Sequence, residues 1–133
     1  MDEALREEFD SFVNQVVEEL PDQLTKLLDE TPLIVEDEPA RHVLDALGVD
    51  RAELCGLFSG VALTDRSPSL PFEPPTSVYI YRLGVRRLAA QQSRLRRSSR
   101  ADELRRQIRI TVLHELGHLH GLDEGDLARL GYG

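Results

Sequence analysis

His114-Glu115-Leu116-Gly117-His118 is the stretch on which the interpretation of this 133-residue sequence depends. It lies in a segment whose apolar residues recur every three or four positions, which predicts a helix from about Ala101 to Leu119. The apolar stripe of this helix is formed by Leu104, Ile108, Val112, Leu116 and Leu119. Ser98 and Ser99 are candidate N-caps, and Gly121 is suited to the left-handed conformation that ends a helix.

The two histidines of this helix are spaced to bind one metal ion. At about 100° per residue, His114 and His118 lie about 40° apart on one helix face, one above the other. Both imidazoles can reach a single ion at roughly 2.0–2.1 Å, the distance typical of zinc. Glu115 lies too far around the helix to be an easy ligand, but it is placed to contact a water molecule at the ion. The pattern therefore predicts a zinc site with Glu115 as the general base.

Other interpretations of the histidines, and of the third ligand, remain open. His114 and His118 flank the apolar stripe, which suits the edge of a cleft, although ordinary surface or core histidines would fit the same pattern. Two histidines leave a tetrahedral site incomplete. Because Gly121 allows the chain to reverse, Glu124 is our first candidate for the third ligand. The alternatives are Asp123 and Asp126.

The rest of the sequence predicts a single α+β domain over residues 1–133, a length typical of one domain. The expected elements are helices at 3–20 and after Pro21, a strand at 33–35, a helix at 39–47, strands at 57–64 and 78–82, and the helix at 101–119. A proline-rich loop is expected at 67–76, and a basic segment with no assigned element follows Arg82. This order predicts a small sheet covered by helices. The strand at 78–82 is interpreted as an ordinary strand of this sheet, and the alternative is an edge strand that pairs with an extended peptide.

The charge distribution is uneven. The net charge is −8, yet residues 82–109 hold ten arginines against two acids, whereas residues 1–65 hold 17 acids against four bases. We expect the arginines to pair mainly with the acidic helices. An acidic partner for the basic segment remains an alternative, and no nucleic-acid binding is expected. No run of apolar residues is long enough to span a membrane. The acidic N-terminus lacks an apolar signal region, and Cys55 is the single cysteine, so a cytoplasmic location is expected.

The sequence resembles the short bacterial minimal-zincin proteins, which are described as zincin-like metallopeptidases. The resemblance rests on residues 35–39, 56–60 and 78–82, and above all on 111–118 continued by 121–124. It implies a minimal zincin fold with a small mixed sheet and a C-terminal active-site helix. It also implies a zinc ion held by His114 and His118 and a peptidase-like site. With Glu124 as the third ligand, we expect a zinc-dependent peptidase of weak activity that acts on peptides or proteins. The alternative is a non-enzymatic, metal-stabilised module that binds a protein or acidic partner; the oligomeric state is not predicted.

Overall fold

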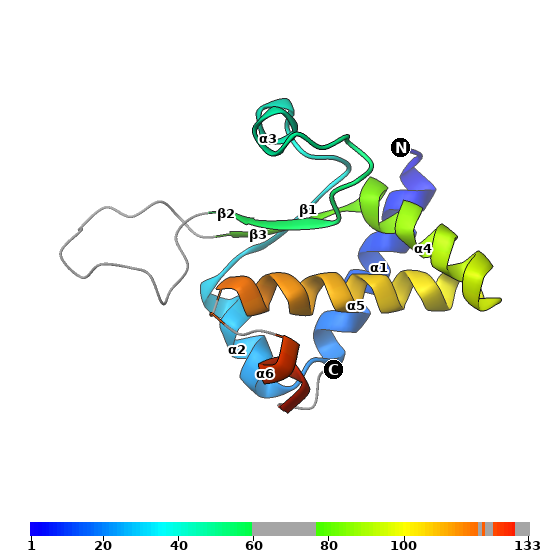
Figure 1. The fold of residues 1–133 in the computed structure, drawn as a ribbon. Coiled ribbons are helices and arrows are strands. Elements are labelled where there is room, and N and C mark those ends of the chain that lie inside the picture. Colours follow the sequence, from blue (N-terminus) through cyan, green and yellow to red (C-terminus); the bar gives the residue numbers. More distant parts are fainter. Residues whose placement is uncertain (60–76, 120, 122–123, 130–133) are drawn as a thin grey trace.

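The computed structural model describes residues 1–59, 77–119, 121 and 124–129, and it shows helices packed with a small sheet (Figure 1). The elements in chain order are α1 (Glu3–Glu19), α2 (Asp22–Glu30), β1 (Leu33–Glu36), α3 (Arg41–Leu47), β2 (Gly56–Ser59), β3 (Ser77–Tyr81), α4 (Arg82–Arg96), α5 (Arg100–Leu119) and α6 (Glu124–Arg129). The α+β class is confirmed. No helix in the described part of the chain is both long enough and apolar enough to cross a bilayer. The end of the strand expected at 57–64 and the loop expected at 67–76 lie outside the described residues.

The three strands form one mixed sheet in the order β1-β3-β2. Strand β1 is parallel to β3, and β2 is antiparallel to it, with Gly56 opposite Ile80. The hypothesis that residues 78–82 form an edge strand is therefore wrong, because β3 is the central strand and ends at Tyr81. Val78 and Ile80 are completely buried, and a central position is favourable for such apolar residues because it shields them from water. In the described residues the edges are β1 and β2.

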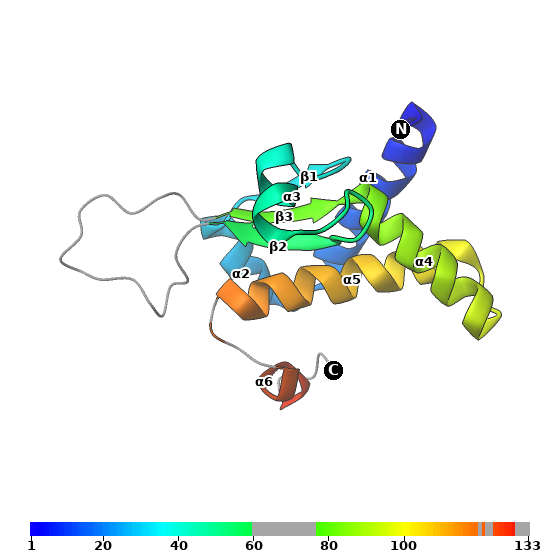
Figure 2. The same cartoon turned by 45° about the horizontal axis from the view of Figure 1, so that its top comes forward.

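Helix α5 packs against both the sheet and α1, as the views in Figures 1 and 2 show. Its apolar stripe is confirmed as far as Leu116, while the side chain of Leu119 lies outside the described ones. The stripe residues Ile108 and Val112 are completely buried. They share the core with three buried residues of α1, namely Phe9, Val13 and Val16. Burial of each such side chain contributes about 1.5–3 kcal/mol, so the core fixes which face of α5 remains outside.

Helix α4 is an element that the sequence analysis missed. Its residues are strongly basic, and the side it buries consists of Gly84, Val85, Ala89 and Ser93. These residues are small or moderately apolar, so the segment shows a weak hydrophobic pattern. Helix α4 makes an extensive contact with α5. At its first turn, the absence of a side chain at Gly84 lets the helix lie against the backbone of Leu54, whose carbonyl oxygen would be 2.2 Å from an added Cβ. The helix ends at Arg97, which adopts a left-handed conformation with φ of 54°.

The predicted ends of the helices are largely confirmed. The Ser99 hydroxyl accepts a hydrogen bond from the backbone N–H of Asp102 at 3.1 Å, so Ser99 is the N-cap of α5. The hydroxyl of the other candidate, Ser98, instead donates to Glu103. Gly48 ends α3 with φ of 66°, and Gly121 has φ of 68° in the turn after α5.

The arginines at the start of α4 pair with acidic residues, as predicted. The Arg82 guanidinium binds Asp10 of α1 at 2.9 Å and Asp37, which follows β1, at 3.0 Å. Arg86 pairs with Glu8 at 3.2 Å. These ion pairs connect α1 to the end of the sheet, because Arg82 directly follows β3.

Candidate metal centre

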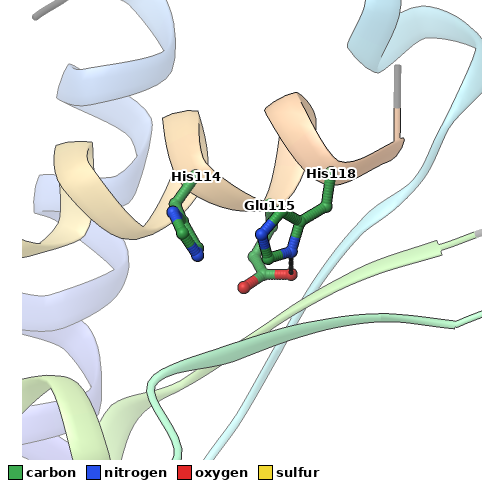
Figure 3. Close-up of side chains that lie close together, drawn as sticks. All are labelled: His114, Glu115 and His118. Carbon is green, nitrogen blue, oxygen red and sulfur yellow. Dashed lines mark ion pairs between the residues drawn. The ribbon is translucent and has the colours of Figure 1, made fainter. Parts of the chain in front are cut away.

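The last two turns of α5 bring His114, Glu115 and His118 together on one side of the helix (Figure 3). The imidazole centroids of His114 and His118 are 4.2 Å apart, and one possible ligand atom from each of the three residues lies within 4.8 Å of the others. Both histidines are exposed. Two imidazoles on one helix face supply two of the three protein ligands of a catalytic zinc site, and the adjacent carboxylate of Glu115 is close enough to contact a water molecule at the ion. The residues present therefore fit a zinc ion.

Glu115 differs from the two histidines because it is buried, with 7 % of its surface exposed. Its Oε2 lies 3.7 Å from Nδ1 of His118, as the dashed line in Figure 3 marks. Burial raises the pKa of the Glu115 carboxyl, while His114 and a hydrogen bond from the backbone N–H of Phe58 act in the opposite direction. A carboxyl group with a raised pKa is better matched to proton transfer near neutral pH.

Strand β2 lies unusually close to α5 beside this carboxyl group. Gly56 makes this approach possible, because an added Cβ at this position would lie 2.7 Å from Cγ2 of Thr111 and 3.0 Å from Cγ of Glu115. The Thr111 hydroxyl donates to the carbonyl of Gln107 at 2.7 Å, which fixes the side chain and its methyl group against Gly56. The absence of a side chain at Gly56 thus allows the backbone of β2 to reach Glu115.

Phe58 of β2 contacts the site with both its backbone and its ring. Its backbone N–H bonds to the carboxylate of Glu115, and its ring meets the imidazole of His118 edge-on, with the centroids 6.1 Å apart. Strand β2 therefore covers the glutamate, whereas 47 % of the His118 side chain remains exposed. The result is a site with a solvent-facing pair of metal-ligand candidates and a proton acceptor shielded by a strand.

The third ligand is not among the groups that the described side chains bring together. Glu124 is the first residue of α6, and its side chain lies outside the described ones, as does Asp123. Asp126 is described, and its carboxylate pairs with Arg129 within the same helix. The chain does turn at Gly121, as the prediction for Glu124 requires. Glu124 stays a prediction.

Sequence reasoning found the histidines and Glu115 but assigned no role to Gly56, Phe58 or Thr111. The signal for Gly56 was present, because a glycine inside a strand often marks a close backbone approach. The sequence analysis used this residue only as part of the resemblance at residues 56–60. The contact of Phe58 with His118 depends on how β2 lies across α5, and no local pattern encodes that packing.

Comparison with protein families gives a match over most of the chain. The profile of a family described as zincin-like metallopeptidase matches residues 28–133. This range contains the whole sheet and the three clustered side chains of α5, and it leaves out α1. A search of curated proteins found no match.

Proposed function

The chain belongs to the zincin-like metallopeptidase family, and from this premise we propose that it hydrolyses peptide bonds with one zinc ion held by His114, His118 and Glu124. The observation that carries the proposal is the clustering of His114, Glu115 and His118 on one side of α5. The predicted third ligand completes a set of three protein donors, which is the usual number in a catalytic zinc site.

Glu115 acts as the general base in the proposed reaction. Zinc, when bound, supplies Lewis-acid chemistry by making water more acidic and polarising a carbonyl oxygen. The Glu115 carboxylate takes a proton from the water molecule as its oxygen bonds to the peptide carbonyl carbon. The same carboxyl then gives the proton to the amide nitrogen as the C–N bond breaks. The backbone N–H of Phe58 lowers the pKa of this carboxyl and so favours the ionised form that accepts the proton.

Strand β2 is the element suited to align a peptide with these groups. It pairs only with β3 among the described residues, so its other edge can bind an extended peptide through backbone hydrogen bonds. The alignment of reacting groups supplies much of an enzyme's acceleration, so peptide turnover should depend on this edge.

The test combines metal analysis and peptide hydrolysis on the same samples. Glu115→Gln keeps the size of the side chain but cannot accept the proton, so zinc content should stay unchanged while turnover falls by roughly 10² or more. His118→Ala should lose both zinc and turnover. The matched control is His42→Ala, which removes an exposed histidine of α3 and should change neither.

Three results would contradict the proposal. Equal hydrolysis by the wild type and by Glu115→Gln would exclude Glu115 as the base. Bound zinc with no hydrolysis of any unstructured peptide by the wild type would favour the metal-stabilised interaction module instead. Stoichiometric zinc in His118→Ala would remove the site as described.

A further inference from the structure

An open groove of about 920 Å³ lies between α1, α4 and the first turns of α5. Ala101 and Leu104 form its α5 side, whereas the metal-ligand candidates begin at His114. At a rise of about 1.5 Å per residue, the groove and the metal centre are separated by about 15 Å along α5. Figures 1 and 2 show this end of the molecule, where the N-terminal end of α1 and helix α4 lie near the start of α5. The groove is thus separate from the proposed active site.

The groove offers an apolar surface that the chain itself leaves open. Met1, which precedes α1, and Leu5 of α1 line it and are 40 % and 39 % exposed. Leu83 and Ala90 of α4, together with Leu104 of α5, add further apolar groups. Apolar residues that gather around an open groove mark binding sites more often than apolar residues scattered singly over a surface.

The carboxylates at the rim of the groove are already paired with arginines. The pairs are Glu8 with Arg86 at 3.2 Å, Glu38 with Arg51 at 3.6 Å, and Asp37 with Arg6 at 2.7 Å and with Arg82 at 3.0 Å. These acidic groups are therefore neutralised within the molecule.

Two arginines of the groove carry a positive charge that no carboxylate of the described residues neutralises. Arg87 donates to the backbone carbonyl of Ala52 at 3.3 Å, and neither Arg87 nor Arg100 has a carboxylate partner among the described residues. Both are exposed. Arg100 is the first residue of α5, where the N-terminal backbone N–H groups add partial positive charge. The groove thus combines an apolar interior with unneutralised cationic groups.

We propose that this groove binds an acidic, apolar peptide segment of a partner protein. The apolar side chains of the segment pack on the walls, and its carboxylates pair with Arg87 and Arg100. An open groove with charges on separate helices suits a peptide better than a small molecule, which favours a more enclosed pocket. The inference goes beyond the proposed peptidase, because α1 lies outside the matched family region and no metal-ligand candidate takes part.

The experiment selects binding peptides without assuming their sequence. Dodecapeptides displayed on phage are selected on the full chain, and the enriched peptides are titrated by fluorescence anisotropy at physiological salt. We expect peptides that combine apolar residues with two or more acidic residues. Arg87→Glu/Arg100→Glu should weaken their binding by about tenfold or more. Arg94→Glu/Arg109→Glu changes the net charge equally, at exposed arginines outside the groove, and should leave binding unchanged. Ala90→Trp fills the groove without changing charge and should also weaken binding.

Several outcomes would overturn the inference. Selected peptides without acidic residues would exclude the charge complementarity, and equal weakening by both arginine pairs would indicate binding to diffuse charge. Concentration-dependent self-association that disappears in Arg87→Glu/Arg100→Glu would show that a second copy occupies the groove instead. Removal of zinc by a chelator should leave peptide binding unchanged. The inference can therefore fail or hold independently of the proposed function.

Discussion

Gly56→Ala is the substitution that most directly tests how the fold builds the metal centre. The added Cβ would lie 2.7 Å from Cγ2 of Thr111, 3.0 Å from Cγ of Glu115 and 3.1 Å from the carbonyl oxygen of Tyr79. Carbon atoms in contact normally lie about 3.5–4.0 Å apart, so β2 must move away from α5 by several tenths of an ångström or more. This movement would carry the backbone of Phe58 away from Glu115.

The expected cost is that of an overpacked core. We expect Gly56→Ala to lower the free energy of unfolding by about 1–3 kcal/mol. Thr111→Ser removes the closest atom and keeps the hydroxyl that donates to Gln107. Alone it should cost about 1 kcal/mol, because one buried methyl group is lost. In the double variant the clash is relieved, so its cost should fall short of the sum of the two by about 1 kcal/mol or more.

The assay is urea unfolding of the four proteins in a double-mutant cycle, with peptide hydrolysis measured on the same samples. Hydrolysis should fall in Gly56→Ala and recover in Gly56→Ala/Thr111→Ser. Gly48→Ala is the control, because its φ is +66° and nothing lies within 4 Å of the added Cβ. It should cost about 1–2 kcal/mol through backbone strain alone, and this cost should be additive with that of Thr111→Ser. Additive costs for Gly56→Ala and Thr111→Ser would refute the assigned contact.

Two further predictions concern the charged surface. The Arg94–Arg100 segment should not confer tight nucleic-acid binding, because the chain is acidic overall and Arg96 of the segment is paired with Glu103. A dissociation constant well below about 10⁻⁶ M for DNA at physiological salt would contradict this. Arg6, followed by Arg82, lowers the pKa of Asp37. The ionised carboxylate therefore stabilises the fold at pH values above its unfolded-state pKa of about 3.9. This stabilisation is lost as the pH falls through the lower pKa of the folded state. Asp37→Asn should therefore cost about 1 kcal/mol at pH 7 and progressively less below about pH 4 in acid titrations of unfolding; a cost that stayed constant down to pH 2 would show that the ion pairs are not its source.

The parts of the fold that were predicted are those in which the local spacing of apolar residues is enough to show which side chains are buried. Helix α5 was predicted because Ile108 and Val112 repeat at helical spacing and both lie in the core. Helix α4 was missed because its buried side holds Gly84 and Ser93, which periodicity does not register as apolar. This side packs against α5 and, at Gly84, against the backbone of Leu54. A local sequence pattern does not contain these neighbours. The central place of β3 depends in the same way on its pairing with both β1 and β2.

In the metal centre too, some features follow from one helix alone, whereas others depend on residues far away in the sequence. The spacing of His114 and His118 is a property of one helix, so it was sufficient to predict that the two rings share a face. The environment of Glu115 depends on a strand that precedes it by more than fifty residues in the chain. Burial by that strand raises the pKa of the carboxyl, and Gly56 is the residue that permits the burial. The motif thus identifies the base, but the contact between β2 and α5 determines how readily it takes up a proton.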